Sequence, residues 1–179
     1  MLKQLFTDAK QEIKFGYLKR NHPFRYPVLA SIEENVPQQR TVVLRDATKD
    51  FELILFTDAR SPKIKQFEAH PAASLLFYHP KKMLQLKVQG EIKIIRSGKQ
   101  LADYWDKIQG KSRKDYTTQS APSQTIKNPD HVDYLTDDNH FCVLKLVPNS
   151  IEYLQLKRPN HIRAIFYETN NWEGEFLVP

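Results

Sequence analysis

Four polar side chains between residues 40 and 63 have types and a spacing that could hold a phosphate group. Arg40 precedes a strand-forming run, Thr57 ends the next run, and Ser61 and Lys63 fall in the first turn of a predicted helix. A helix N-terminus offers free amides and a positive dipole, while arginine adds a planar fork and lysine a point charge. A capping serine beside two solvated cations would have the same spacing, so the residues alone leave both interpretations open.

The stretch "RTVVLRD", residues 40 to 46, adds a second arginine to this set. If the run is one strand, Arg40 and Arg45 lie roughly 17 Å apart along it and, at odd spacing, on opposite faces. Two such cations are either solvated charges at the strand ends or contacts to an elongated anionic ligand that lies across the strand.

Other chemistry has little support in the sequence. The six histidines show no metal-ligand spacing, and no GxSxG, P-loop or GxGxxG motif occurs among only five glycines. The single cysteine, Cys142, lies in the apolar run "FCVLKLV", which predicts a buried and unreactive thiol. We therefore expect no metal site, and no catalytic residue can be named.

The elements that must position these residues are mostly strands. Apolar spacing predicts an amphipathic helix within residues 1–20, a short helix from Ser61 to Pro71 and a helix around Tyr104. Alternating runs predict strands at 27–34, 41–46, 51–58, 73–79, 83–95, 140–148, 150–157, 164–168 and 172–179, with a polar loop at 110–130 near the site. The pattern favours a mainly β fold, a closed antiparallel β-barrel of roughly eight strands with peripheral helices, as a single domain over 1–179.

Composition indicates a soluble globular protein with an anionic partner. The chain has 40% hydrophobic and 27% charged residues, no long apolar run and no signal peptide, so we expect a cytoplasmic protein without membrane contact. Its net charge of +6 comes from bases interleaved with acids. A phosphate-bearing small molecule fits this pattern. The basic pairs at 81–82 and 113–114, with Tyr116 nearby, keep nucleic acid as an unlikely alternative.

The segment "RTVVLRD…LILFTDARSPKIKQFEAHPAASLLFY…QLKVQGEI" resembles the FMN-binding core of the pyridoxamine 5'-phosphate oxidase-like split barrels. That pattern runs R-x-V-L-L-K, F-Y-T-N-x-x-S-R-K-x-x-Q-I, N-P-x-x-S-L-x-F and Q-V-x-V-x-G, and its counterparts here run from Arg40 to Glu91 in the same order. The resemblance implies an antiparallel FMN-binding split barrel. It also implies a homodimer with the flavin site at the subunit interface and a small-molecule substrate.

The resemblance assigns roles to individual residues. Arg40 and Lys63 would hold the FMN phosphate with Thr57 and Ser61 nearby, while Arg45 would lie on the substrate side of the flavin. Gln85 would reach the ring, "TTQSAP" would supply two contacts, and in "HIRAIFY" Arg163 would reach the flavin and His161 the substrate. The implied cofactor residues are Arg40, Thr41, Val42, Val43, Leu44, Arg45, Phe56, Thr57, Ser61, Lys63, Gln85, Gln119, Ser120 and Arg163; the implied substrate contacts are Arg45, Tyr104 and His161.

Three departures fall at positions where the family has functional residues. Pro62 stands in place of one basic phosphate ligand, Leu154 in place of a tryptophan at the flavin edge, and Pro159 in place of an arginine, with Arg158 adjacent. The substrate-phosphate motif keeps Tyr104 and Trp105 but shows no confident match for its arginine and serine. The cofactor site is therefore better preserved than the substrate site.

Three functional hypotheses follow. The first is an FMN-dependent oxidoreductase of unassigned substrate, in which hydride passes from a carbon bearing an amine or hydroxyl to the flavin. The second is a true pyridoxamine or pyridoxine 5'-phosphate oxidase. The third is a flavin-binding or basic nucleic-acid-binding barrel module without turnover.

Overall fold

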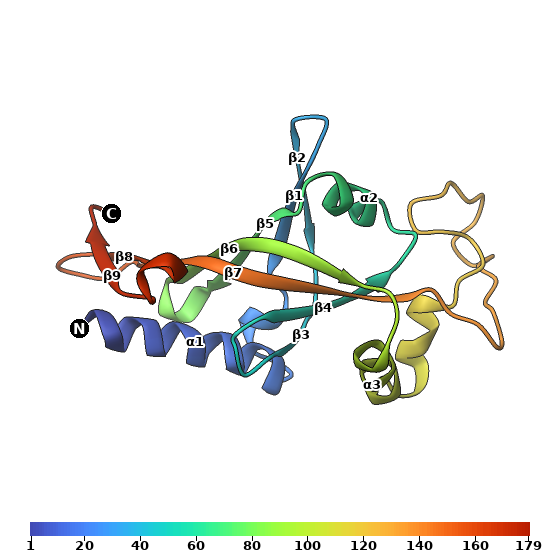
Figure 1. Cartoon of the computed structure of the whole chain (residues 1–179), viewed down its shortest axis with the longest axis horizontal. Helices are drawn as coiled ribbons and strands as arrows, with labels where there is room; N and C mark the ends of the chain where they lie inside the picture. Colours follow the sequence, from blue (N-terminus) through green and yellow to red (C-terminus); the bar gives the residue numbers. More distant parts are fainter.

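A computed structural model describes all residues 1–179 and shows a nine-stranded antiparallel sheet with helices around it (Figure 1). The helices are α1 (Leu2–Leu18), α2 (Pro62–Ala69) and α3 (Lys99–Lys107), with 3-10 segments η1 (Pro23–Arg25), η2 (Pro80–Lys82), η3 (Gly110–Tyr116) and η4 (Glu168–Asn170). The strands are β1 (Val28–Glu33), β2 (Val36–Thr41), β3 (Leu44–Ala47), β4 (Leu53–Asp58), β5 (Ala72–His79), β6 (Leu84–Ile95), β7 (Phe141–Gln155), β8 (Ile162–Tyr167) and β9 (Gly174–Leu177). The predicted mainly β, antiparallel class is confirmed.

The sheet is curled but not closed by hydrogen bonds. Its strand order is β2-β1-β5-β6-β7-β4-β3, with β8 paired to β7 and β9 to β8. The two ends of this path, β2 and β3, are consecutive in the chain and separated only by Val42 and Val43. The Val42 amide donates to the Pro27 carbonyl beside β1, and no ladder of hydrogen bonds joins β2 to β3. These two edge strands are therefore connected only by the covalent chain. The expectation of a closed barrel was wrong in this respect.

The sequence indicated that "RTVVLRD" forms one strand, but in the structure the stretch is divided between β2 and β3. Arg40 belongs to β2, opposite Leu29 of β1, whereas Arg45 belongs to β3, where a bulge shifts the register between Leu44 and Asp46. The break at 42–43 and the bulge remove the simple alternation of faces. The two arginines can therefore face the same space.

Strand β7 is continuous where the sequence predicted two strands. Pro148 suggested a turn, but the residue lies opposite Gly90 of β6, at a register shift that absorbs the irregularity. A Cβ on Gly90 would lie 2.0 Å from the carbonyl oxygen of Val147, so only glycine fits this close approach. As a result, β6 and β7 form one long ladder between the two ends of the molecule.

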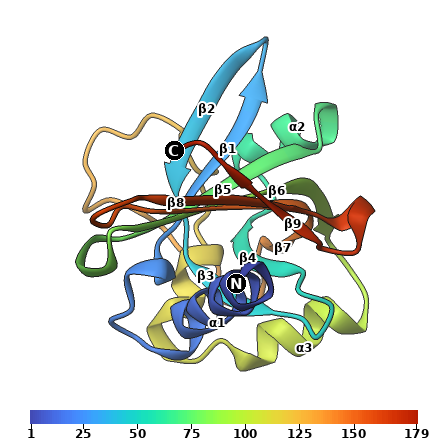
Figure 2. The same cartoon turned by 90° about the vertical axis from the view of Figure 1, so that its left-hand side faces the viewer.

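Two apolar clusters support the ends of this ladder. Helix α1 buries Leu5, Ala9 and Ile13 against the sheet, and Figure 2 shows α1 below the sheet with the β1–β2 hairpin extending above it. A smaller cluster lies under α3, where Tyr104 packs near Phe141. None of the helices has the length and apolar character needed to cross a membrane.

Cys142 lies in the main cluster and is completely buried. Burial raises the pKa of its thiol to about 11, so the thiol stays protonated at neutral pH. This agrees with the expectation of an unreactive cysteine.

Candidate functional site

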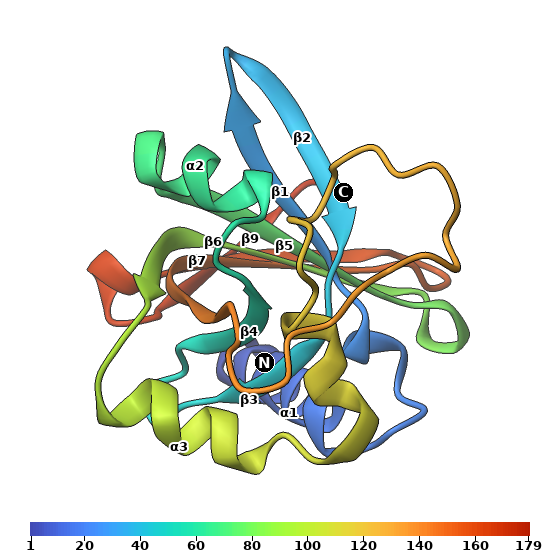
Figure 3. The same cartoon turned by 90° about the vertical axis from the view of Figure 1, so that its right-hand side faces the viewer.

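Two cations meet where β2, β4 and α2 come together, at the end of the molecule seen in Figure 3. The Lys63 Nζ donates to Thr57 Oγ1 at 3.0 Å and to Ser61 Oγ at 2.6 Å. Pro62 at the first helical position fixes this turn, with Ser61 as the N-cap residue. The structure thus brings Thr57, Ser61 and Lys63 together as the sequence predicted. We call these three residues and Arg40 the basic cradle.

Arg40 is held in place by neutral acceptors. Its Nη1 donates to Ser31 Oγ at 2.6 Å and its Nη2 to Gln66 Oε1 at 2.8 Å. Neither Arg40 nor Lys63 forms an ion pair with a carboxylate. The cradle therefore carries positive charge that its immediate neighbours do not neutralise.

The electrostatics of the cradle favour a bound anion. Burial lowers the pKa of Lys63, and the charge of Arg40 lowers it further, while Asp58 opposes the shift. Burial likewise lowers the pKa of Arg40. The charge of Glu33 opposes the shift of the Arg40 pKa. Two partly buried cations so close together are stabilised when a dianion such as a phosphate ester lies between them.

A cavity of about 250 Å³ opens from the cradle. The chain that crosses from β2 to β3 forms one part of its wall, and Asp115 and Tyr116 form another. Eight of the predicted cofactor residues line it: Arg40, Thr41, Val42, Val43, Arg45, Phe56, Thr57 and Lys63. A ninth, Leu44, is fully buried and lines the neighbouring cavity instead.

Arg45 connects this cavity to a second one of about 380 Å³. Its guanidinium lies 5.4 Å from the centre of the Phe56 ring, and its Nε is buried without a hydrogen-bond partner in the chain. A buried donor without a partner is costly, and an acceptor on a bound ligand would satisfy it. Both cavities thus share a cation with unused hydrogen-bonding capacity.

The second cavity also contains the predicted substrate residue Tyr104, whose pKa is raised by burial. Six further polar residues line it that the sequence did not single out as site residues: Tyr17, Arg25, Asp46, Lys107, Gln109 and Ser112. Lys107 follows Tyr104 by three positions on α3 and so shares its face, which is a signal that helical spacing could have provided.

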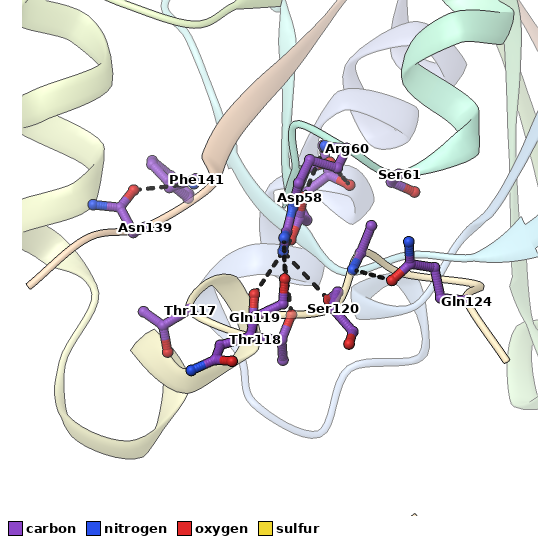
Figure 4. A network of polar contacts seen from close by, with 12 residues as sticks. Asp58, Arg60, Ser61, Thr117, Thr118, Gln119, Ser120, Gln124, Asn139 and Phe141 are labelled. Atoms are coloured by element: carbon purple, nitrogen blue, oxygen red, sulfur yellow. Dashed lines mark hydrogen bonds and ion pairs between the residues drawn. The ribbon is translucent and has the colours of Figure 1, made fainter. Parts of the chain in front are cut away.

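The predicted contacts Gln119 and Ser120 lie beside the cradle but not on the wall of its cavity. In Figure 4 the segment from Thr117 to Ser120 lies against the turn that joins β4 to α2. Arg60 of this turn donates to the backbone carbonyl of Gln119 at 2.8 Å. The structure therefore places this segment near the cradle through a residue that sequence reasoning missed.

The remaining predicted ring contacts are at the other end of the molecule. Gln85 of β6 pairs with Leu154 of β7, which pairs with Arg163 of β8, so the three form a row across the sheet. Thr57 pairs with Cys142, twelve positions earlier on β7 than Leu154. At 3.3 Å per residue this is roughly 40 Å along the strand, so one chain does not bring the row and the cradle together.

The row is electrostatically complete. Arg163 donates to Glu152 at 2.7 and 2.8 Å, and Lys87 lies 2.6 Å from the second oxygen of the same carboxylate. Burial alone would raise the pKa of Glu152, but the hydrogen bonds from Lys87 and Arg163 outweigh it and lower that pKa. His161 is nearby and accepts a hydrogen bond from the Lys157 amide at 3.1 Å.

A polar cluster away from both regions was also missed from the sequence. The ligand-capable atoms of Glu12, His22 and His79 lie within 4.8 Å of one another. The Nδ1 atoms of both histidines accept backbone amides, from Phe24 and from Lys82, so each neutral ring carries its proton on Nε2. This chemistry describes a hydrogen-bonded cluster around a carboxylate and not a set of metal ligands.

Comparison with known proteins agrees with this geometry. A sequence profile described as pyridoxamine 5'-phosphate oxidase, FMN-binding domain, matches residues 3–96. A pyridoxine/pyridoxamine 5'-phosphate oxidase from Wolbachia pipientis wMel is 21% identical over 89% of this chain and 82% of its own length. The pyridoxine/pyridoxamine 5'-phosphate oxidase 2 of Arabidopsis thaliana is 26% identical over 82% of this chain and 83% of its own.

Solved structures show the same fold. An FMN-binding, pyridoxamine 5'-phosphate oxidase-related protein from Nostoc punctiforme PCC 73102 superposes with a TM-score of 0.77, at 23% identity over 97% of this chain and 96% of its own. PhzG from Burkholderia lata 383, in complex with tetrahydrophenazine-1-carboxylic acid, gives 0.78 at 14% identity over 97% and 92%. With its curled antiparallel sheet and basic cradle, the chain belongs to the pyridoxamine 5'-phosphate oxidase family of FMN-binding split barrels.

Proposed function

We propose that this protein is an FMN-dependent oxidoreductase that acts on a small anionic substrate. One observation carries the proposal: a cradle of two cations without carboxylate partners opens, through Arg45, into a second polar cavity that contains Tyr104. The first cavity suits the phosphate and chain of a mononucleotide, and the second suits a substrate beside its ring.

The residues of the cradle fit FMN. Arg40 and Lys63 would bind the phosphate, with Thr57 and Ser61 as hydroxyl partners. The unpartnered Nε of Arg45 would donate to an acceptor at the ring end of the cavity. When bound, the flavin supplies the hydride-transfer chemistry, and the protein supplies binding, orientation and charge. A cation held beside the ring stabilises negative charge there.

The substrate cavity favours an anion. Arg25, Arg45 and Lys107 line it together with one carboxylate, that of Asp46. Tyr104 and Ser112 add hydroxyl groups that can position a polar substrate. The relatives point in the same direction, since two are named for phosphorylated substrates and the Burkholderia protein is described with a bound carboxylic acid.

A homodimer would complete the site. The row of Gln85, Leu154 and Arg163 lies too far from the cradle to reach the same flavin within one chain. The strand face that carries this row also exposes Leu76 and Tyr78, at 37% and 48% of their surface. A second copy that covers this face would bury that apolar surface and bring its own row, with His161, to the first copy's cradle.

Titration with FMN tests the cofactor assignment. Arg40→Ala should weaken FMN binding by about 1.5 to 3 kcal/mol, because it removes a charge-assisted contact to the phosphate. Arg20→Ala is the matched control, since Arg20 is exposed and lies outside both cavities. Thermal unfolding of the cofactor-free variants shows whether loss of the bonds to Ser31 and Gln66 alone accounts for the change. Equal FMN affinity of Arg40→Ala and the parent protein would exclude the cradle as the phosphate site.

Two further candidates concern turnover. The presence of Tyr104 and Arg45 in one cavity favours a pyridoxamine 5'-phosphate oxidase, whereas Leu154 and Pro159 in place of an aromatic residue and an arginine favour flavin binding without turnover. Anaerobic bleaching of the FMN-loaded protein by pyridoxamine 5'-phosphate would support the oxidase. Bleaching by a reduced nicotinamide alone would support a reductase, and no bleaching by any donor would support a binding protein.

A further inference from the structure

Arg60 makes an unusual set of contacts between two separate parts of the chain. Its Nη2 donates to the Thr118 carbonyl at 2.8 Å, its Nη1 to the Gln119 carbonyl at 2.8 Å, and Nη2 approaches the Ser120 carbonyl at 3.4 Å. Figure 4 shows the guanidinium between Asp58 and this stretch of backbone. One side chain therefore contacts three successive carbonyl groups, those of Thr118, Gln119 and Ser120.

Asp58 fixes the direction of this guanidinium. The carboxylate is 4% exposed and accepts from Arg60 Nε at 3.1 Å, from Nη2 at 2.7 Å and from the Arg60 backbone amide at 2.7 Å. A buried carboxylate requires such a partner, and a two-pronged contact orients the guanidinium in its plane. Arg60 is consequently committed to Asp58 and the segment, and it does not line the cradle cavity.

Few hydrogen bonds tie this segment to the rest of the protein, although the Ala59 amide donates to the His140 carbonyl just beyond it, at 2.7 Å. Residues 117–138 are hydrogen-bonded among themselves and to Lys114, for example Gln119 to Asp133 and Leu135 to Thr117, with an isolated bridge between Thr118 and Tyr134. Outside 114–140, Arg60 alone donates to the segment. A segment with few external bonds opens easily when such a contact is removed.

We infer that Arg60, oriented by Asp58, is a positioning residue that holds residues 118–120 against the basic cradle and slows the release of the bound cofactor. Arg60 immediately precedes Ser61, the N-cap residue of α2, and lies three positions before Lys63, so its contacts fix the segment relative to the phosphate site itself. Asp115 and Tyr116, which line the cradle cavity, immediately precede the segment. This inference rests on the proposed FMN function, but the contact that it describes exists without the cofactor.

Hydrogen exchange of the cofactor-free protein tests the contact directly. In Arg60→Ala, the Gln119 and Leu135 amides should exchange at least about tenfold faster, because the segment opens more often. Arg60→Lys keeps the charge but not the fork, so it should show an intermediate increase. Arg96→Ala is the matched control, since it also removes one arginine and one ion pair, with the exposed Glu68, and Arg96 makes no hydrogen bond to the segment.

The rate of FMN dissociation tests the consequence. We expect Arg60→Ala to release FMN about tenfold faster than the parent protein, with Arg96→Ala unchanged. If the parent protein takes up no FMN, the proposed function fails, while the exchange data still decide the contact. If the parent protein binds FMN and both Arg60 variants match it in amide exchange and dissociation rate, the inference is overturned. Arg60→Lys keeps the test decisive if Arg60→Ala does not fold.

Discussion

The two ends of the molecule treat their cations in opposite ways. In the basic cradle, Arg40 and Lys63 bind only neutral oxygens of serine, threonine, glutamine and backbone groups. In the row on β6 to β8, Arg163 shares the buried carboxylate of Glu152 with Lys87. The cradle therefore has charge available for an anion, whereas Arg163 in the row is already paired with a carboxylate and its geometry is fixed. Only the cradle could bind a phosphate on its own.

This difference explains why neither end is a complete site. The cradle has the charge and the cavity, but the implied ring contacts Gln85 and Arg163 lie at the other end of the chain. The row has an amide, an apolar side chain and an oriented arginine on one sheet face, and none of these residues lines the two cavities beside the cradle. The two ends would complement each other if the cradle of one copy of the chain and the row of a second copy bound the same flavin.

The largest effect should come from the ladder that separates the two ends. Gly90→Ala places a Cβ 2.0 Å from the Val147 carbonyl oxygen and 2.9 Å from the Pro148 Cα, both of which are backbone atoms that cannot move independently. We expect a loss of about 3 kcal/mol or more in the free energy of unfolding, measured by urea denaturation.

Gly98→Ala provides the scale for this measurement. No heavy atom lies within 4 Å of its added Cβ, so only the backbone conformation, with φ +88° and ψ 177°, opposes alanine, at a cost of about 2 kcal/mol. Equal losses in the two variants would show that β6 and β7 adjust freely at the register shift. The long, rigid separation of the two ends would then no longer hold.

The first half of this fold could be read from local patterns. Helix α2 followed from Ser61, Pro62 and an apolar stripe, and β6 followed from strict alternation. Three cradle residues, Thr57, Ser61 and Lys63, lie within one strand-helix unit, where short-range rules apply, whereas Arg40 comes from β2 and was assigned through the family resemblance. Strand β2 was only partly predicted, since Pro37 and two glutamines have poor strand propensity but are tolerated at a sheet edge.

Contacts between distant segments could not be predicted from spacing. Arg60 meets residues 118–120 across about sixty positions, and Glu12 meets His79 across a similar interval. The sequence predicted that a strand ends at Pro148, because it does not reveal that Gly90 lies opposite this proline and accommodates it. The prediction that Arg40 and Arg45 lie on opposite faces of one strand was wrong. The strand breaks at Val42 and Val43 because the chain crosses there from one sheet edge to the other, and residue type does not reveal this crossing.

Mixed dimers should give the next largest effect, and they test whether the two ends meet in trans. Arg40→Ala damages only the cradle and Arg163→Ala only the row, so each homodimer should bind FMN at least about tenfold more weakly. When equal amounts are unfolded and refolded together, about a quarter of all sites should combine an intact cradle with an intact row. FMN titration of the mixture should show this fraction with the parent affinity.

Two controls make this experiment decisive. Mixing two preparations of Arg40→Ala alone should restore no site, and sedimentation should show the same dimer in every sample. If the mixed sample binds FMN no better than its components although dimers form, the row does not act on the partner's cradle. The two ends would then be functionally separate.

The smallest effect is the uptake of a fraction of a proton when FMN binds, and we expect it from the cradle and not from the row. Burial and Arg40 lower the pKa of Lys63 in the cofactor-free protein from 10.5, so the unfolded chain binds more protons than the folded chain between the two pKa values. Stability of the cofactor-free protein should therefore rise with pH in that alkaline window, to the extent that Lys63 controls it.

A bound phosphate dianion favours the charged lysine, so FMN binding should take up a fraction of a proton there, and FMN affinity should fall as the pH rises. Calorimetry in two buffers of different ionisation enthalpy measures this uptake, and Lys63→Arg, which stays charged, should abolish it. Because the carboxylate of Glu152 already satisfies Lys87 and Arg163, the row should contribute no such uptake; a signal that persists in Lys63→Arg would mean that the cradle is not where the phosphate binds.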